Sequence, residues 1–493
     1  MEMAHKPINA FPGYEFKRLD DNKFHNMYRG VDLGKGGWVY TDPGIYSNVA
    51  LLDISSMHPS SIIALNKLGE YTQRYADLKQ ARVYIKHGDY EAAGKLFDGK
   101  LKKYLTNKKT AKALSSALKL PLNAFFGQSF AGYDNPARDS RDENNIIALR
   151  GSLFMKTLFD EVEARGFHIV HVKTDSVKVP NATPEIIKFI QDFAKKYDYD
   201  IEHEATYERM CLIDKAQYIA SYASEEQCVE LYGYCPSENK DYIQDHGYTW
   251  TATGAEFQHP YIFKTLFSGE SIVFDDLCET KTVKDAAMYL DMNEGYPNVE
   301  IFDKELLKRI NNIENPDNVM KLNSDLESYS NEDLENKIAE GHNFIFIGRV
   351  GRFIPIKPGA GGGILLALRN GKYNSVNGTK DFRWLEAEVV KNVHKEGDRD
   401  LNYYKNLIDK AIKFIEQFGS FEHFIDISKP YDWKPQYNDP PGCEGISDDD
   451  LPFDLVPCGD GKRTSCLECP NLSGDICKRG YSLNSYVELG GGA

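Results

Sequence analysis

The sequence predicts an α+β fold, and three local patterns indicate it. Residues 48–54 (NVALLDI) form a continuous apolar run, which is typical of a buried strand. Residues 170–179 (VHVKTDSVKV) alternate Val with polar residues on both sides of the tetrapeptide Lys-Thr-Asp-Ser, and this alternation predicts a β-hairpin. Residues 152–165 place Phe154, Leu158 and Val162 on one face of an amphipathic helix.

The remaining elements follow from turn and cap signals. Residues 36–46 are turn-rich and lead into the apolar strand, after which Ser60 or Ser61 caps a short helix. Ser152 caps the amphipathic helix and Gly166 ends it. The other expected elements are two basic helices over 71–119 joined near Gly88, helices at 185–196, 303–340 and 402–418, strands at 201–213 and 216–223, and a Gly-rich β region at 343–384.

Composition and charge restrict the classes of protein. The chain has 493 residues, of which 41% are hydrophobic, so it has room for about two to four domains with real cores. The net charge of −15 argues weakly against a nucleic-acid partner, but the charge is segregated. Residues 79–119 hold eleven Lys and Arg against three Asp and Glu, whereas residues 439–454 hold six acids and no base. Any site for a polyanion should therefore lie in the first quarter of the chain.

The sequence lacks the patterns that are typical of membrane-spanning and secreted proteins. No apolar run approaches the length of a membrane span, and the N-terminus lacks the basic-then-apolar pattern of a signal peptide. The nine cysteines do not resemble a secreted disulfide framework, because five of them are scattered. We expect a cytoplasmic protein without a membrane partner.

Three segments carry the residues of a reaction centre. Asp53 stands near the end of the apolar strand, and Asp175 stands at the hairpin tip. Lys119, Asn123 and Phe126 share one helical face, because spacings of four and seven residues return to nearly the same direction. A charged hairpin tip is by itself usually a solvated turn. Two carboxylates on adjacent strands that face a basic helix are, however, what two-metal phosphoryl transfer requires.

The three segments resemble motifs A, B and C of family B DNA polymerases, in the order of that family. The family patterns are D-x-x-S-L-Y-P-S, K-x-x-x-N-S-x-Y-G and Y-x-D-T-D-S. They stand here as DISSMHPS (53–60), KLPLNAFFG (119–127) and HVKTDS (171–176). The resemblance covers residues 30–225 firmly and 226–400 loosely, the latter through sequences similar to the thumb side of bacteriophage members.

The resemblance implies a right-hand polymerase fold with an antiparallel-sheet palm, a short helical fingers pair, a mixed thumb and a Cys-rich C-terminal tail. The expected parts are a lead-in to the palm (1–48), palm with motif A (49–70), fingers with motif B (71–130), palm with motif C (131–230), thumb with an associated β region (231–435), and an acidic linker with the Cys-rich tail (436–493).

The resemblance also implies roles for individual residues. Asp53 and Asp175 would be the catalytic ligands of two Mg²⁺ ions, or Mn²⁺, with the carbonyl of Ile54 as a further ligand. The implied nucleotide-binding residues are Ser56, Met57, His58, Arg82, Lys86, Lys119 and Asn123, and the implied DNA-binding residues are Thr174, Lys215, Tyr218 and Gly127. Lys215 and Tyr218 match a K-K-x-Y segment in which Ala216 replaces the second lysine.

The implied function is template-directed addition of dNTPs to a primer 3′-OH in viral DNA replication, in the cytoplasm of a host cell. The partners would be primer-template DNA and dNTPs. Only 52 residues precede Asp53, too few for the upstream 3′–5′ exonuclease of the family. A separate exonuclease or replisome subunit is therefore a further expected partner, unless proofreading is missing. Acidic pairs such as Asp200 and Glu202 are interpreted as unrelated to an exonuclease.

Several features of these segments differ from what the family patterns would lead us to expect. Lys173 replaces the first Asp of motif C, and His58 replaces the tyrosine that excludes a ribose 2′-OH. Ala124 replaces a Ser, and Pro121 predicts a kink in the motif B helix. These departures keep two alternatives open. One is a catalytically inactive polymerase-like scaffold, and the other is a primase-polymerase with relaxed sugar selection.

The tail presents four cysteines, Cys458, Cys466, Cys469 and Cys477, around one C-x-x-C pair. Four thiolates suit a structural Zn²⁺ site, although the outer spacings are wide, and an iron–sulfur cluster uses the same ligands. Unrelated reduced thiols are the third interpretation.

Overall fold

The computed structural model describes residues 11–135, 137, 145–292, 344–369 and 372–428, and the backbone of two short strands, β18 (Leu472–Ser473) and β19 (Ile476–Cys477). The chain divides into two compact units, Met1–Tyr431 and Asp432–Ala493. This boundary lies beside the predicted acidic linker. The helices predicted over 303–340 lie outside the described residues.

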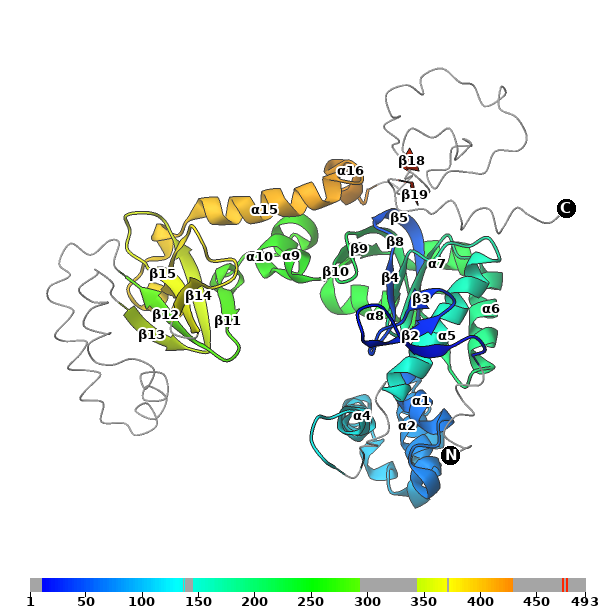
Figure 1. The fold of residues 1–493 in the computed structure, drawn as a ribbon. Helices are drawn as coiled ribbons and strands as arrows, with labels where there is room; N and C mark the ends of the chain where they lie inside the picture. The colour runs from blue at the N-terminus through cyan, green and yellow to red at the C-terminus, as the bar shows by residue number, and fades with distance from the viewer. Residues whose placement is uncertain are drawn as a thin grey trace. The chain divides into compact units, whose positions relative to one another are not determined.

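An antiparallel sheet forms the centre of the first unit, as predicted (Figure 1). Its seven strands stand in the order β10-β9-β8-β5-β7-β6-β4, and every neighbouring pair is antiparallel. The strands are β4 (Val39–Thr41), β5 (Gly44–Ile54), β6 (His171–Lys173), β7 (Ser176–Pro180), β8 (Ile201–Leu212), β9 (Tyr218–Tyr222) and β10 (Trp250–Thr253).

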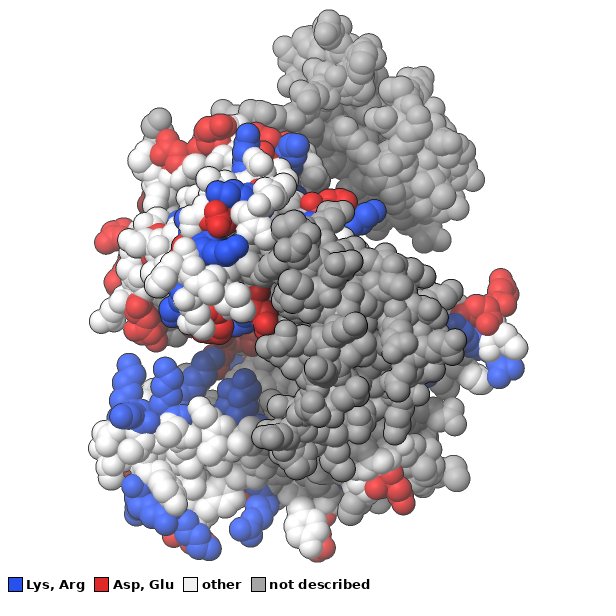
Figure 2. Space-filling view, turned by 90° about the vertical axis from the view of Figure 1, so that its left-hand side faces the viewer, with Lys and Arg blue, Asp and Glu red and all other residues white. Residues whose placement is uncertain are grey.

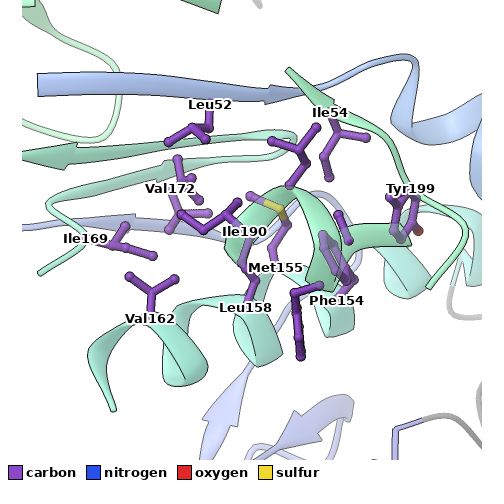
Figure 3. Close-up of a cluster of buried hydrophobic side chains, with 14 of the residues drawn as sticks. Leu52, Ile54, Phe154, Met155, Leu158, Val162, Ile169, Val172, Ile190 and Tyr199 are labelled. Carbon is purple, nitrogen blue, oxygen red and sulfur yellow. The ribbon is translucent and has the colours of Figure 1, made fainter. Parts of the chain in front are cut away.

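One face of this sheet packs on two helices, α5 (Ile146–Glu163) and α6 (Pro184–Lys195). Leu52 and Val172 from the strands meet Phe154 and Leu158 from α5 in a fully buried cluster (Figure 3). Because side chains alternate along a strand, the neighbours of Leu52 in sequence point to the opposite face. Asp53 is one of these neighbours, so the apolar core and the predicted reaction centre lie on opposite faces of one sheet.

Ser152 is not a helix cap. The helix α5 begins at Ile146 after the N-cap Asn145, and Ser152 lies buried inside it. Its hydroxyl accepts a hydrogen bond from the Trp38 amide and donates to the Gly36 carbonyl, both at 2.9 Å. The prediction was wrong because the apolar run before Ser152 continues the buried face of the same helix. Gly166 ends the segment with φ +81°, as predicted.

The serine caps predicted after β5 are also wrong. The helix α1 (Met57–Ala64) begins directly after Ser56, four residues earlier than expected. The Ser60 hydroxyl donates to the Ser56 carbonyl at 3.0 Å inside the first turn, and the Ser61 hydroxyl meets the Tyr199 hydroxyl at 2.7 Å. The helix starts early because Ser56 itself adopts a left-handed backbone, with φ 62°, and turns the chain sharply out of the strand.

The basic segment folds into three helices rather than two. They are α2 (Thr72–Lys86), α3 (Tyr90–Lys95) and α4 (Lys108–Ser129), and Gly88 makes the first turn with φ +76°. Asn107 caps α4 by accepting from the Thr110 amide at 3.0 Å, which separates α4 from the turns before it. The element α4 continues through Pro121 as one helix.

Lys and Arg side chains gather over these helices, which form the lower part of Figure 2. The exposed lysines there are Lys86, Lys95, Lys100, Lys102, Lys103, Lys108, Lys109, Lys112 and Lys119. This agrees with the predicted basic region in the first quarter of the chain. Of the helices within the described ranges, none is both long enough and apolar enough to cross a membrane.

A second β region follows the sheet and has its own core around Trp384. One of its sheets has the order β11-β14-β17 and the other the order β13-β12-β15-β16. The Gly-rich β region predicted over 343–384 corresponds to most of these strands, and the helix predicted at 402–418 is α15. The bounds are β11 (Glu279–Thr282), β12 (Ala287–Asp291), β13 (Phe344–Gly348), β14 (Val350–Ile356), β15 (Ile364–Arg369), β16 (Lys372–Ser375), β17 (Arg383–Glu386), α14 (Ala387–Asn392), α15 (Leu401–Glu416) and α16 (Phe421–Ile425).

Among the described residues, the other elements are a small sheet and four short α-helices. A small antiparallel sheet near the N-terminus has the order β1-β2-β3, and short helices follow β9 and β10. They are β1 (Glu15–Arg18), β2 (Phe24–Tyr28), β3 (Val31–Asp32), α7 (Glu225–Tyr232), α8 (Ser237–His246), α9 (Ala255–Gln258) and α10 (Pro260–Phe263).

Candidate functional site

The structure brings the two predicted catalytic carboxylates together. Asp53 is the penultimate residue of β5 and stands opposite Ser176 of β7 and Glu202 of β8. Asp175 occupies the turn that leads into β7, and its carbonyl accepts from the Ile54 amide at 2.8 Å. The end of β5 and the hairpin tip are therefore joined by a backbone hydrogen bond, which places the two aspartates side by side.

The hairpin tip is a two-residue turn made by Thr174 and Asp175. Lys173 pairs with Ser176, and Thr174 adopts a left-handed backbone with φ 58°. The Thr174 amide donates to the Trp38 carbonyl at 3.2 Å, and the Asp175 amide donates to the Lys173 carbonyl at 2.7 Å. A non-glycine residue in this conformation is strained, so the contact with the Trp38 segment helps to hold the tip in place.

The environment of both aspartates disfavours their charged form. Burial raises the pKa of Asp53 to about 8, and the nearby carboxylates of Asp175 and Glu204 add to the effect. Burial also raises the pKa of Asp175, while its own backbone amide and Lys178 oppose that rise. Among the described residues, the Asp53 carboxylate accepts no hydrogen bond and forms no ion pair within 4 Å. A half-buried carboxylate without a partner is chemically suited to a cation.

The donor set for a metal is small. Two carboxylate side chains and the carbonyl of Ile54 are hard oxygen donors, which is the chemistry that Mg²⁺ and Mn²⁺ prefer. Within the described ranges, no group of three or more His, Cys, Asp or Glu side chains is arranged to hold a metal ion. The residues therefore fit a divalent cation that receives its remaining ligands from water or substrate.

Glu202 and Glu204 belong to the surroundings of the site, and the sequence interpretation missed them. Lys86, from the end of α2, lies 2.7 Å from Glu202 and 3.8 Å from Glu204. The ring of His87 lies 3.3 Å from Glu202. The alternation Glu-His-Glu at the start of β8 was the available signal, because a strand projects residues two apart toward the same side.

The nucleotide-binding residues predicted on α1 and α2 also meet. Arg82 donates to the Ser56 hydroxyl at 3.0 Å, so the basic face of α2 lies against the turn after β5. Ser56 is the N-cap of α1, whose first amides have no partner within the helix. Met57 is buried, and a Cβ at Gly151 would lie 2.6 Å from its sulfur atom. Met57 can therefore offer only its backbone to a ligand.

His58 stacks on Phe126 of α4, with ring centroids 3.9 Å apart and an angle of 11° between the planes. Burial lowers the pKa of His58, so the ring is neutral at pH 7, and its buried Nδ1 atom has no hydrogen-bond partner. Lys119 and Asn123 lie exposed on the same helix as Phe126. No described contact joins Lys119 or Asn123 to the two aspartates.

The predicted DNA-binding residues lie at four places in the fold, and Thr174 is at the hairpin tip described above. The Lys215 carbonyl, in the loop between β8 and β9, accepts from Nε2 of His171 at 3.3 Å. Tyr218 begins β9 and is half-buried, with its ring 4.7 Å from Nζ of Lys178. Gly127 is exposed on α4, and a Cβ added there would meet no atom within 4 Å.

The metal site predicted in the tail lies outside what the structure describes. Cys458, Cys466 and Cys469 fall among residues that are not described, and Cys477 is described only as part of the backbone of β19. The described cysteines, Cys211, Cys228, Cys235 and Cys278, are free thiols.

Gly37 allows the close approach of the hairpin tip. A Cβ at this position would lie 2.5 Å from two side-chain atoms of Thr174, whereas a Cβ at Gly36 would meet nothing within 4 Å. We expect Gly37→Ala to displace the turn that carries Asp175 and to lower catalytic activity by about 100-fold, because shifts of roughly 1 Å have such effects. Steady-state rates measured beside Gly36→Ala test this. Equal rates for the two variants would contradict it.

Comparisons with known proteins show a distant similarity to solved structures. No protein-family model matches the sequence, and no curated protein matches it at a significant level. Among solved structures, the chain is similar to the family B DNA polymerase from the hyperthermophilic archaeon Pyrobaculum calidifontis, with a TM-score of 0.38 and 12% sequence identity. The superposition covers 78% of this chain and 47% of that one, so this chain spans about half the length of the archaeal protein.

Proposed function

We propose that this chain is a template-directed DNA polymerase that adds dNTPs to a primer 3′-OH by two-metal-ion phosphoryl transfer. The observation that carries the proposal is the position of Asp53 and Asp175. Two carboxylates with raised pKa values, one at the end of β5 and one at the neighbouring hairpin tip, have no cationic partner in contact among the described residues. The basic helix α2 meets the turn after β5 through Arg82, and the basic helix α4 packs on α2. The order of the motifs in the sequence supports the same reaction.

Individual residues of the chain would have separate roles in this reaction. Asp53 and Asp175, with the Ile54 carbonyl, would hold two Mg²⁺ or Mn²⁺ ions. Such ions activate the attacking hydroxyl and stabilise charge on the departing pyrophosphate. The backbone amides at the start of α1 would donate hydrogen bonds to phosphate oxygens, since the N-terminus of a helix is an anion site. Arg82, which already contacts Ser56, would add positive charge there.

Lys86 would exchange its partners when a nucleotide arrives. It is paired with Glu202 and Glu204, so it reaches a triphosphate only after it leaves these carboxylates. Thr174, Lys215, Tyr218 and Gly127 would contact primer or template, chiefly through phosphates. Binding to DNA should therefore weaken steeply as salt is raised.

We also propose a biological context for this enzyme and a role for its tail cysteines. The thumb-side sequences over 226–400 favour a bacteriophage-type enzyme, which would act in viral DNA replication in the host cytoplasm. The four tail cysteines would hold a structural Zn²⁺ ion or an iron–sulfur cluster.

Primer extension tests the proposal directly. The purified chain, a primed template, dNTPs and Mg²⁺ should give extended primers, and removal of Mg²⁺ with EDTA should stop the reaction. If the folded chain binds primed DNA but extends no primer with either Mg²⁺ or Mn²⁺, the inactive scaffold is the better description.

The second candidate is a primase-polymerase with relaxed sugar selection. The observation in its favour is His58, a neutral ring smaller than the tyrosine of the family pattern, at the start of α1. The stacked rings of His58 and Phe126 nevertheless form a flat surface that would act as a barrier to a ribose 2′-OH. Parallel reactions with NTPs separate the candidates, because only the second predicts efficient ribonucleotide incorporation and synthesis without a primer.

A further inference from the structure

Lys178 is a buried cation on the same sheet face as Asp53. It stands opposite Leu51 of β5 and His171 of β6, while Ser176, two residues earlier, stands opposite Asp53. Residues directly opposite each other in an antiparallel sheet point to the same side. Lys178 therefore lies on the same sheet face as Asp53, two residues further along the neighbouring strand β7. Only 3% of its surface is exposed.

The contacts of Lys178 are neutral. Its Nζ atom donates to Nδ1 of His171 at 3.2 Å and lies 4.7 Å from the centre of the Tyr218 ring. Burial and the neighbouring lysine lower the pKa of His171 to about 3, so this ring is neutral and accepts at Nδ1 while Nε2 donates to the Lys215 carbonyl. Within the described residues, Lys178 forms no ion pair within 4 Å.

A buried ammonium group without a contacting carboxylate needs compensation from charges farther away. Burial lowers the pKa of Lys178 to about 8, and the charge of Lys173 adds to this effect. Three carboxylates, Asp53, Asp175 and Glu204, each raise this pKa, so that Lys178 is mostly charged at pH 7. The effect is mutual, since Lys178 lowers the pKa of Asp175. The carboxylates of the candidate site and Lys178 therefore interact electrostatically, although no described contact joins them.

We propose that Lys178 is a positioning residue of the candidate metal site: a fixed internal cation that offsets the repulsion between Asp53 and Asp175 and weakens their binding of divalent cations. This inference deepens the proposed function and rests on it. If Lys178 only stabilised the core through its contacts with His171 and Tyr218, its replacement would leave the affinity for metal ions unchanged.

Direct binding of Mn²⁺ to the full chain tests the inference without any need for catalysis. Free Mn²⁺ is measured by electron paramagnetic resonance in the absence of DNA and nucleotide. Removing one unit charge several ångströms from the ion should tighten binding about five- to tenfold. We expect this shift in Lys178→Met and in Lys178→Gln, which keeps a polar group near His171.

Two matched variants keep the positive charge or remove it elsewhere. Lys178→Arg retains the cation, and Lys188→Met removes an exposed lysine that pairs with Asp192 on α6. The affinity of both variants for Mn²⁺ should stay within about twofold of the wild-type affinity, which is clearly less than the change of about five- to tenfold expected for the neutral variants. Circular dichroism confirms that each variant is folded before its binding is compared.

The outcomes separate the inference from the function on which it rests. If the wild type binds Mn²⁺, Asp53→Asn removes that binding, and a folded neutral variant of Lys178 binds no tighter than the wild type, only the inference is overturned. If the wild type binds no Mn²⁺ through Asp53, the proposed function fails and the inference fails with it. Tighter binding in both neutral variants, with the two control variants unchanged, supports the inference.

Discussion

Asp53→Asn is expected to lower the rate of primer extension by about a thousandfold or more. The change keeps the size of the side chain but removes the negative charge from the end of β5. A metal-bound carboxylate contributes several kcal/mol to the transition state, and about 4 kcal/mol corresponds to a thousandfold change in rate. Single-turnover rates with saturating dNTPs and Mg²⁺ measure the loss. A variant that extends primers at the wild-type rate would contradict the proposed role.

The same substitution is expected to stabilise the folded chain at alkaline pH. The pKa of Asp53 is raised to about 8 in the folded state from its ordinary value of 3.8. The folded state therefore keeps this proton where the unfolded chain has lost it, so stability falls as pH rises from about 4 to about 8. Asparagine does not titrate and avoids this loss.

Melting temperatures between pH 5 and pH 8.5, measured without divalent cations, check the second effect. The advantage of Asp53→Asn over the wild type should grow across this range. Asp192→Asn is the matched control, because Asp192 lies half-exposed on α6 and a hydrogen bond from Lys188 lowers its pKa. A gain in melting temperature that is equal at every pH would contradict the assigned pKa shift.

Arg209→Met is expected to destabilise the first unit by about 3–5 kcal/mol. Arg209, on β8, is fully buried, and its guanidinium donates to the carbonyls of Phe424 and Asp426 at 3.1 and 2.8 Å. It also pairs with Glu208 at 2.8 Å. Methionine fills part of the volume but leaves a buried carboxylate and two carbonyls without this donor. The central sheet would lose its polar connection to the end of α16.

Thermal unfolding followed by circular dichroism measures this effect, with an expected fall in melting temperature of roughly 3–6 °C. Arg352→Met is the matched control, because Arg352 is 46% exposed and its partner Asp275 is 73% exposed. A surface pair of this kind contributes about 0–1 kcal/mol. Equal melting temperatures for the two variants would show that burial of Arg209 does not matter.

Local patterns were sufficient for several elements of the fold. The apolar run before Asp53 became β5, the alternating residues around Asp175 became a hairpin, and the helix at 185–196 is α6. These patterns succeed because one face of each element is buried, so the period of the apolar residues reports the conformation directly. Helix starts were predicted poorly. Ser152 and Ser60 have the chemistry of caps, but both lie inside longer helices, where the Ser60 hydroxyl donates to the Ser56 carbonyl and the Ser152 hydroxyl donates to the Gly36 carbonyl.

The sequence by itself determined which residues have the chemistry of a phosphoryl-transfer site and in what order they occur, since Asp53, Lys119 and Asp175 stand in recognisable motifs. Only the tertiary structure decided which further charges surround them. Strand register places Glu202 opposite Asp53, and it places the buried Lys178 on the same sheet face as Asp53, where the two charges interact. Register and burial depend on contacts between residues far apart in the chain, and a local pattern does not contain them.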